Sequence, residues 1–324
     1  MQVEIQSNRA ACAKALSCWF LTGATAGGKT QVGLHLARLL NAEIISLDSM
    51  AIYREMNIGT AKPSPQQQAE VPHHMIDILD PTESFSVSRF REMALARIDE
   101  IRSRGKEVLF VGGSALFLKA LLRGLFEGPP ADWGFREEVE AEVKKYGEEP
   151  LHQRLRVLDP LSAHKLHVND RRRLIRALEV VHLTGKPISH WQMEFDHATR
   201  AEDCRVFTLR HPRAILHERI ANRVASMFAT GFVDEVRGLI DKYQNLSRTA
   251  AQAVGYCEVI EHLAGRRTLP ETMEQTLIRT RRFARHQETW FRGLSECEFV
   301  ELAGEIPPEK TAETILERGR ARAV

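Results

Sequence analysis

The chain has 324 residues, 43% of them hydrophobic, which is enough for one large domain or two smaller ones. Charged residues make up 27% of the sequence, but the formal net charge is only +2, so net charge alone predicts no polyanionic partner. The longest apolar runs are far shorter than the ~20 residues that cross a bilayer, and the N-terminus lacks the apolar region of a signal peptide. The five cysteines form no C-x-x-C pair, which favours unpaired thiols in a reducing compartment. We therefore expect a cytoplasmic protein with no membrane-spanning segment.

The chain alternates between strand-like and helix-like segments. Four short apolar runs predict buried strands, at residues 18–23, 42–48, 107–113 and 204–210. Helical patterns follow the first three of these runs, at residues 30–40, 88–104 and 116–125. Short buried strands that alternate with helices predict an α/β fold, with a mostly parallel sheet that helices flank on both faces.

Residues 128–200 differ in pattern from the segments on either side. They open with Gly-Pro-Pro and then read as helices with no convincing strand. We predict an all-helical insertion domain here, within a core domain of residues 17–127 and 201–324 that has a helical C-terminal part. We expect residues 1–16 to form a flexible lead-in.

The stretch GATAGGKT, Gly23 to Thr30, matches the phosphate-binding loop (P-loop) pattern G-x-x-x-x-G-K-[ST] between a predicted strand and a predicted helix. Its glycines let backbone N–H groups point at a phosphate, and the following helix presents its positive N-terminal end to the same anion. Lys29 adds a positive charge, and Thr30 offers a hydroxyl to Mg²⁺. The sequence therefore predicts a phosphate site with Mg²⁺ held at Thr30.

Two further predicted strands end in loops at the same edge of the sheet. Asp48 follows the second strand, and ligands bind at this edge in open α/β sheets, where a carboxylate can accept a proton or serve a metal. A lone aspartate at a strand end is otherwise a helix cap, but the polar and basic residues that follow weaken that alternative. Gly112 and Gly113 end the third strand and allow close approach of a ligand. Ser114 after them is explained equally well as a helix cap.

Six ordered segments together resemble the tRNA dimethylallyltransferase family, also called tRNA isopentenyltransferases. The segments are GATAGGKT, SLDSMAIYR, NIGTAKP, VGGSALFLKAL, HVNDRRRLIRALEVVHLTGKPIS and RRFARHQETWFR. The P-loop alone is unspecific, but the ordered set is highly specific and runs over nearly the whole chain. The resemblance implies a P-loop core with a helical insertion. It also implies transfer of a dimethylallyl group from dimethylallyl diphosphate to N6 of the adenine 3′-adjacent to the anticodon in tRNA, with release of diphosphate.

The resemblance also assigns roles to individual residues. Asp48 is expected to be the general base that takes a proton from the adenine amine, while the P-loop and Mg²⁺ stabilise the departing diphosphate. Arg219 and Arg223 match helix arginines near the diphosphate and, four positions apart, share one helix face. The expected catalytic residues are Asp48, Thr25, Lys29 and Ser114. The expected diphosphate-binding residues are Gly23, Ala24, Thr25, Ala26, Gly27, Gly28, Lys29, Thr30, Arg219 and Arg223.

The expected partner is tRNA, whose target adenine has to leave its stack to reach a buried site. Basic side chains should contact phosphates, and flat side chains should stack on bases. The expected tRNA-binding residues are Asp48, Ser49, Met50, Ala51, Arg172, Arg173, Leu174, Ile175, Arg176, Gln252, Tyr256, Arg281, Arg282 and Arg285. For each arginine cluster a solvated helix face is the alternative. We expect the protein to be a monomer.

The chain departs from the family pattern at a few positions. Ala24 and Gly27 stand where the family loop usually has Pro and Ser, and Ala51 stands where a Gln is usual. These departures concern fine positioning, because the lysine, the hydroxyl and the carboxylate of the expected site are all kept. Two other functions stay open at the level of sequence: a P-loop small-molecule kinase and a catalytically idle tRNA-binding protein.

Overall fold

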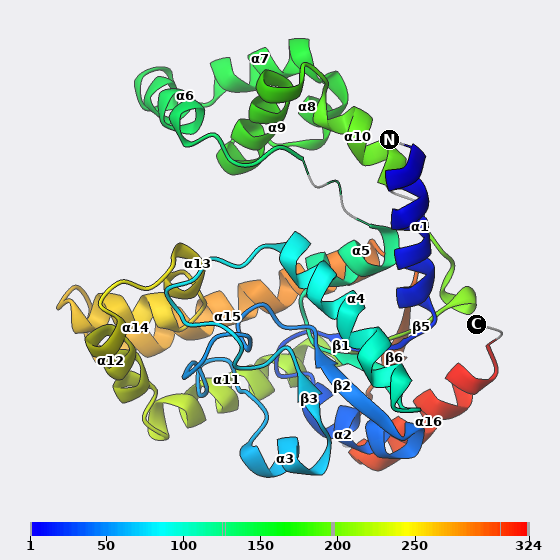
Figure 1. The fold of residues 1–324 in the computed structure, drawn as a ribbon. Coiled ribbons are helices and arrows are strands. Elements are labelled where there is room, and N and C mark those ends of the chain that lie inside the picture. Colours follow the sequence, from blue (N-terminus) through cyan, green and yellow to red (C-terminus); the bar gives the residue numbers. More distant parts are fainter. Residues whose placement is uncertain (1, 125, 127, 196–197, 305, 323–324) are drawn as a thin grey trace. The chain divides into compact units, whose positions relative to one another are not determined.

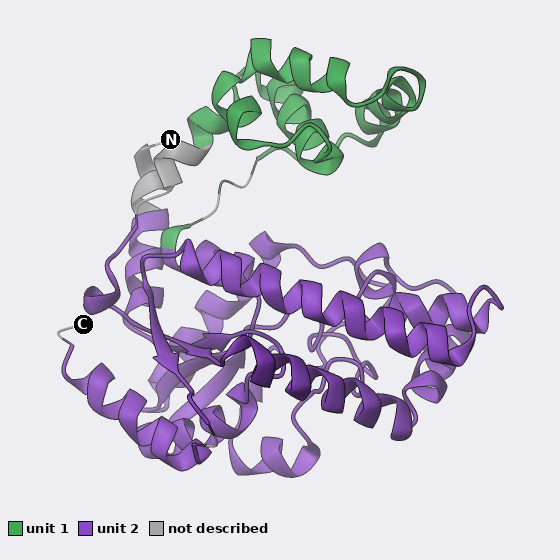
Figure 2. Cartoon of the chain, turned by 180° about the vertical axis from the view of Figure 1, so that it is seen from behind, with its two compact units in different colours: residues 1–6, 123–197 green, residues 7–122, 198–324 purple. Residues whose placement is uncertain are grey.

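The structure is a computed structural model that describes residues 2–124, 126, 128–195, 198–304 and 306–322. Residues 1, 125, 127, 196, 197, 305, 323 and 324 lie outside the described residues, so what the sequence predicts for them stays a prediction. The chain divides into two compact units, which Figure 2 shows in different colours. Unit 1 comprises Met1–Gln6 and Arg123–His197, and unit 2 comprises Ser7–Leu122 and Ala198–Val324.

Unit 2 is built on a six-stranded sheet in the order β3-β2-β4-β1-β5-β6 (Figure 1). All five strand pairs are parallel. The strands are β1 (Trp19–Gly23), β2 (Ala42–Ser46), β3 (His73–His74), β4 (Glu107–Val111), β5 (Arg205–Arg210) and β6 (Cys297–Glu301). The predicted fold class, a parallel α/β sheet of P-loop type, is confirmed.

Successive residues of a strand point to opposite faces of the sheet, and this alternation creates two apolar cores. Phe20 and Phe110 lie in one core, where their rings stack with centroids 4.7 Å apart. Trp19, Leu21 and Phe207 lie in the other core, which α2 and α16 cover. Because both faces are buried, the strands read as nearly continuous apolar runs.

The helices around the sheet include a long one, α15, which begins with a capping box: Thr268 and Glu271 each accept from the other's backbone N–H. The helices with residues in unit 2 are α1 (Gln2–Leu16), α2 (Lys29–Leu40), α3 (Pro65–Glu70), α4 (Val87–Ser103), α5 (Ala115–Arg123), α11 (Arg213–Ala229), α12 (Phe232–Tyr243), α13 (Arg248–Ala251), α14 (Tyr256–Leu263), α15 (Leu269–Arg292) and α16 (Pro308–Arg320), with a 3₁₀ turn at Ala201–Asp203. None of the helices described has the length and apolar character that crossing a membrane requires.

The regular secondary structure of unit 1, in its described residues, consists of helices. Its helices are α6 (Trp133–Tyr146), α7 (Glu149–Leu158), α8 (Pro160–Lys165), α9 (Arg171–Thr184) and α10 (Ile188–Phe195). They enclose a core of their own, to which Leu155, Leu174 and Leu178 contribute. The insertion predicted at residues 128–200 covers these five helices, while the compact unit begins earlier, at Arg123, and ends at His197.

The expectation of a flexible lead-in at residues 1–16 is wrong, because α1 spans Gln2–Leu16. Its alanine-rich second half favours a helix. Tertiary contacts also hold that half in place, because Ala15 is fully buried and Lys14 Nζ donates to Asp99 Oδ2 at 2.7 Å. The apolar pattern of this segment is too weak to predict the helix, and tertiary contacts stabilise it instead.

Candidate active site

The P-loop leaves β1 at Gly23 and enters α2 at Lys29, at the edge of the sheet where the strands end. Ala26 and Gly28 adopt left-handed conformations with φ of 60° and 82°, and alternation of this kind makes a concavity lined by backbone N–H groups. Gly27 N–H donates to the Ala24 carbonyl at 3.1 Å. A Cβ atom on Gly27 would lie 2.8 Å from that same oxygen, so the turn as formed here requires glycine.

Lys29 folds back onto the P-loop. Its Nζ donates to the carbonyl oxygens of Gly23 at 3.0 Å and of Ala24 at 2.7 Å. Burial, and next the positive charge of Arg223, lower the pKa of Lys29 to about 8, while Asp48 acts in the opposite direction. A phosphate oxygen is a stronger acceptor for a charged amine than a backbone carbonyl, so an anion in the pocket can recruit this side chain.

Both arginines predicted on α11 lie beside the P-loop. Arg219 Nε donates to the Ala26 carbonyl at 2.8 Å, and Arg223 lines the pocket. Burial lowers the pKa of Arg223, and the charge of Asp48 opposes that shift. Among the described residues, the Arg223 guanidinium has no hydrogen-bond partner, which leaves it available to an anion.

Asp48 follows β2 and lines the same pocket. Its Oδ1 accepts from the backbone N–H groups of Met50 at 2.8 Å and Ala51 at 3.3 Å, so one carboxylate oxygen does cap a turn. No residue in the described part of the chain donates a hydrogen bond to Oδ2. Asp48 thus combines a fixed orientation with one oxygen that is open to a ligand.

Ser114 lies beside the pocket and is absent from its described lining. Its Oγ accepts from the Ser49 backbone N–H at 3.1 Å, and its own N–H donates to the Leu47 carbonyl at 3.0 Å. The hydroxyl therefore joins the loop after β4 to the turn that holds Asp48. The structure shows the serine in a supporting position beside the pocket, and its expected catalytic role stays a prediction.

Gln287 on α15 belongs to the site but was not predicted from the sequence. This buried side chain accepts from the Thr25 N–H at 2.8 Å and donates to the Gly113 carbonyl at 2.9 Å, so it bridges the P-loop and the loop after β4. A Cβ on Gly113 would lie 2.3 Å from the Gln287 amide nitrogen, which explains the second glycine of the Gly-Gly pair. The signal was present in the sequence, because Gln287 and Phe283 lie four residues apart and therefore share one helix face.

These elements surround a cavity of about 180 Å³ at the carboxyl ends of β1, β2 and β4. The P-loop from Thr25 to Thr30 lines one part of it, and Thr60, Ala61, Lys62 and Pro63 line another part. The described lining residues are Thr25, Ala26, Gly27, Gly28, Lys29, Thr30, Gln31, Ile44, Ser46, Asp48, Ala51, Thr60, Ala61, Lys62, Pro63, His73, Ile76, Val111, Gly112, Gly113, Arg223, Phe283 and Gln287. Phosphate-binding groups and a carboxylate thus share one cavity.

The described residues hold no cluster of three or more His, Cys, Asp or Glu side chains that could bind a metal by themselves. Mg²⁺ needs no such cage, because it keeps several waters and is usually held by one or two protein oxygens and by substrate phosphates. Thr30 lies in the cavity together with Asp48, so the oxygens present fit Mg²⁺ that arrives with a diphosphate.

A second cavity, of about 510 Å³, lies between α11 and α15, and we call it the basic groove. Arg281, one of its arginines, has a buried Nε with no partner among the described residues. Burial lowers the pKa of His217 in the groove, and the nearby positive charges of Arg281 and Arg213 lower it further. The described lining residues are Arg213, Leu216, His217, Ile278, Arg281, Arg282, Ala284, Arg285, Glu288 and Arg292. Of the predicted tRNA contacts, the groove brings together Arg281, Arg282 and Arg285.

The predicted tRNA contacts on α9 divide into buried and exposed side chains. Leu174 and Ile175 are buried in the core of unit 1, so their side chains cannot contact tRNA, which corrects that prediction. Arg176 is held by the Glu179 carboxylate at 2.5 Å and by the Pro129 carbonyl at 3.0 Å. Arg172 and Arg173 are exposed near the N-terminus of the helix.

Gln252 and Tyr256 also differ in how far their side chains are exposed to solvent. Gln252 is exposed at the end of α13. Tyr256 is only 1% exposed, and its hydroxyl donates to Glu235 Oε1 at 2.7 Å, so the structure does not support the predicted tRNA contact by its side chain. On the Asp48 turn, Ala51 lines the cavity, whereas Met50 packs against the apolar core.

Comparisons with known proteins agree on one family. A family model described as IPP transferase matches residues 51–294. The chain is 48% identical over 284 residues to the tRNA dimethylallyltransferase of Rhodopirellula baltica, with 85% of each chain covered. It is 43% identical over 281 residues to that of Geobacter sulfurreducens, with 87% of this chain and 90% of the other covered.

Two solved structures have the same fold. The full-length tRNA isopentenylpyrophosphate transferase of Bacillus halodurans aligns with a TM-score of 0.67 at 36% identity, over 94% of this chain and 97% of that one. A eukaryotic dimethylallyltransferase acting on tRNA aligns with a TM-score of 0.70 at 25% identity, over 88% and 73% of the two chains. The predicted small-molecule kinase alternative is thereby overturned, and the chain belongs to the tRNA dimethylallyltransferase family of prenyl-transferring enzymes.

Proposed function

We propose that this enzyme transfers a dimethylallyl group from dimethylallyl diphosphate to N6 of the adenine 3′-adjacent to the anticodon in tRNA, and releases diphosphate. The observation that carries the proposal is that Asp48 and the P-loop line one cavity. The cavity therefore offers a cradle for the leaving group and a carboxylate for the nucleophile. The relatives named above as tRNA dimethylallyltransferases support the same chemistry.

In this reaction negative charge builds up on the departing diphosphate, and the P-loop side of the cavity can stabilise it. Backbone N–H groups of the loop, Lys29 and Arg223 all present positive charge to the same space. Thr30 would hold Mg²⁺ together with the diphosphate, and the bound ion would add Lewis-acid stabilisation of the leaving group. Arg219, held at the Ala26 carbonyl, supports the outer side of the loop.

The adenine N6 amine is a weak nucleophile, because its lone pair is delocalised into the ring. Asp48 Oδ2 can take the amine proton while the new C–N bond forms, because Oδ1 is already fixed by the turn. Phe283 lines the cavity and is nevertheless 44% exposed, so its ring offers a surface on which the extruded base can stack.

Contacts with tRNA phosphates are proposed for the basic groove. α11 contributes Arg213 to its lining and α15 contributes the other arginines, and Glu288 is the single carboxylate among the described lining residues. Exposed Arg172 and Arg173 on α9 offer further phosphate contacts. Charge reversal at Arg281 and Arg285 should weaken tRNA binding and lower the salt slope by about one unit for each arginine that no longer binds a phosphate. The same change at Arg172 and Arg173 should act in the same direction, and an unchanged slope would remove those residues from the interface.

We also propose that the protein acts in the cytoplasm, where tRNA is available, and as a monomer without a membrane attachment. Light scattering coupled to size exclusion measures the mass in solution. The monomer proposal requires the mass of one chain, 36.8 kDa, with and without tRNA.

The reaction is tested with radiolabelled dimethylallyl diphosphate and unmodified tRNA, followed by identification of the labelled nucleoside. A tRNA with guanine in place of the target adenine is the control, because guanine lacks the N6 amine. Asp48→Ala should keep tRNA binding and lose about 10²- to 10⁴-fold in turnover, the usual contribution of a general base. Full activity in that variant would remove the base assignment, and a wild-type chain that binds tRNA without labelling it would be the catalytically idle protein.

A further inference from the structure

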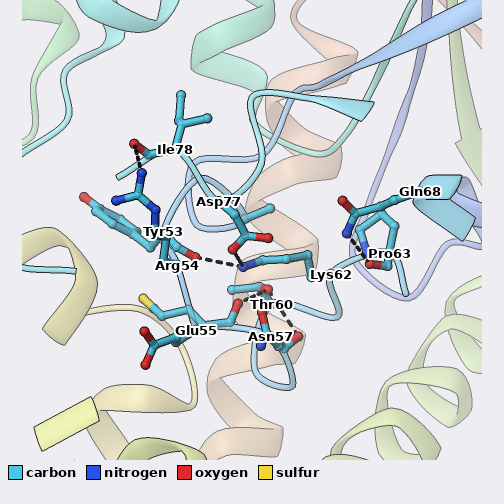
Figure 3. A network of polar contacts seen from close by, with 12 residues as sticks. Tyr53, Arg54, Glu55, Asn57, Thr60, Lys62, Pro63, Gln68, Asp77 and Ile78 are labelled. Atoms are coloured by element: carbon cyan, nitrogen blue, oxygen red, sulfur yellow. Dashed lines mark hydrogen bonds and ion pairs between the residues drawn. The ribbon is translucent and has the colours of Figure 1, made fainter. Parts of the chain in front are cut away.

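Thr60, Ala61, Lys62 and Pro63 line part of the cavity, and they belong to an irregular segment of chain, residues 53–63, which we call the wall loop. Figure 3 shows polar contacts within this loop and with its neighbours. Lys62 Nζ donates to the Tyr53 carbonyl at 2.8 Å and to Asp77 Oδ1 at 2.5 Å. Thr60 Oγ1 donates to the Met56 carbonyl at 2.7 Å. These bonds close the loop but do not attach it to the helical part of unit 2.

Glu235, in the first turn of α12, makes one attachment of the loop to that part of the unit. Its Oε2 accepts from the backbone N–H groups of Asn57 at 3.0 Å and Ile58 at 2.7 Å, and its Oε1 accepts from that of Gly59 at 3.4 Å. Three successive N–H groups form a concavity that binds an anion, and here the anion is a side chain of the same protein. Charge-assisted hydrogen bonds of this kind are stronger than those between neutral groups.

Tyr256 completes the attachment from α14. Its hydroxyl donates to Glu235 Oε1 at 2.7 Å, and burial together with the Glu235 charge raises its pKa well above the usual value, so it remains a donor. Gly59 lies directly against its ring. A Cβ at residue 59 would be 2.3 Å from a Tyr256 ring carbon and 2.6 Å from a Phe232 ring carbon. Glu235 therefore holds residues 57–59 by three hydrogen bonds, and two rings pack closely against Gly59. Lys242 and Tyr243 of α12 make a second attachment, because both donate to Glu55 in the same loop.

We propose that Glu235 and Tyr256 are positioning residues for the transfer reaction: they fix the wall loop and so set the shape of the part of the cavity that it lines. Neither residue lines the cavity, so both act through the loop. Asp48 lies in the same stretch of chain, shortly before the wall loop begins. Reactants held in a fixed geometry react faster than loosely held ones. This inference rests on the proposed function, because it concerns how the same cavity holds its substrates.

The test compares three variants with the wild-type enzyme. Glu235→Ala removes the acceptor for all three N–H groups, whereas Glu235→Gln keeps one amide oxygen in its place. Tyr256→Phe removes the hydroxyl but keeps the ring against Gly59. Asp234→Asn is the matched control, because this neighbouring carboxylate is 77% exposed and pairs with Arg237 on its own helix.

Steady-state kinetics with both substrates should separate positioning from folding. We expect Glu235→Ala to lower kcat/KM by about tenfold, equivalent to ~1.4 kcal/mol of transition-state stabilisation, with a raised KM for the diphosphate donor. Glu235→Gln and Tyr256→Phe should each lose about two- to fivefold, since each keeps part of the attachment. Hydrogen exchange at residues 57–59 should become faster in the same order, and Asp234→Asn should match wild type in every measurement.

A merely structural role predicts a different result. It would reduce the fraction of active enzyme found by active-site titration and leave KM and kcat per active molecule unchanged in all three variants, which would overturn the proposal. If Glu235→Ala does not fold, the two conservative variants decide, and wild-type kinetics in both would likewise overturn it. A wild-type enzyme that transfers no label would instead contradict the proposed function, so the two failures are distinguishable.

Discussion

Lys29 of the P-loop and Lys62 of the wall loop both line the same cavity, and their partners differ. Lys62 is 3% exposed and forms an ion pair with Asp77 as well as a hydrogen bond to a carbonyl. Lys29 bonds only to carbonyl oxygens of the P-loop, and its pKa is lowered to about 8. The charge of Lys62 is therefore neutralised by a carboxylate of the same chain, whereas Lys29 has no such ion pair among the described residues.

The difference indicates which lysine serves a ligand. A buried ammonium without an anionic partner is costly, and a bound phosphate relieves that cost. Lys62 gains nothing from such a ligand, because Asp77 already supplies the negative charge. The same residue type at the same cavity is thus available for binding on one side and structural on the other.

The substitution with the largest expected effect on this comparison is Lys29→Met. Removal of the one charged amine that can move to the leaving diphosphate should lower kcat/KM for the donor by about 10²- to 10³-fold, the usual effect of losing one such donor. Initial rates at varied donor concentration measure it. Because the side chain makes only carbonyl contacts, thermal stability should change little, and a smaller kinetic loss than in Lys62→Met would reverse the assignment of the two lysines.

The second test is the pH dependence of donor binding. The pKa of Lys29 in the free protein is about 8, below its ordinary value, so its charge is lost as the pH rises through that value. Donor affinity measured by calorimetry should therefore fall about tenfold between pH 7 and pH 9. Lys29→Arg keeps its charge throughout this range and should bind with little pH dependence. An equally steep decline in that variant would assign the titration to another group.

The third test is Lys62→Met, which should act on stability more than on catalysis. It removes a hydrogen bond to a carbonyl and an ion pair with Asp77, whose side chain is 41% exposed. Since Asp77 can be solvated when it is left alone, we expect the free energy of unfolding to fall by about 1–2 kcal/mol. Urea denaturation measures this, and kcat/KM per folded molecule should stay within about tenfold of wild type.

The smallest effect is expected for Gly27→Ser. The new Cβ would lie 2.8 Å from the Ala24 oxygen, so the turn that also supplies a carbonyl to Lys29 would have to open slightly. We expect donor affinity to weaken by about two- to fivefold, because small backbone shifts at well-packed sites cost on the order of 1 kcal/mol. Calorimetric titration with the donor measures this affinity. Tighter binding by the variant would show that the turn formed with Gly27 weakens donor binding in this chain.

The parts of the fold that repeat a local pattern were predictable from the sequence. The four central strands were predicted because burial of both faces gives them apolar runs of sequence. The P-loop was predicted from the spacing of its glycines. β3 has only two residues, and β6, Cys-Glu-Phe-Val-Glu, alternates in an edge position, so neither produced a strong run. α1 depends on tertiary contacts such as that of Lys14 with Asp99, which no local pattern encodes.

The site was predictable where chemistry lies in a motif and unpredictable where it depends on burial. Asp48 and Lys29 line the cavity as expected. Tyr256 and Leu174 were assigned to tRNA because their segments resemble those of the family, but both side chains are buried. Gln287 was missed because its two partners, Thr25 and Gly113, are brought to it only by the fold.

The central position of β1 has a consequence for how the chain folds during synthesis. Thr22 of β1 bonds to Thr208 of β5 at 2.8 Å across 186 residues of sequence. Closing so long a loop is entropically costly and slow, and it cannot begin until β5 has left the ribosome. Between β1 and β5 the ribosome makes the helices of unit 1, which have a core of their own. We therefore expect the helical insertion to acquire structure first, and the P-loop to take its final form only when the later strands dock beside it.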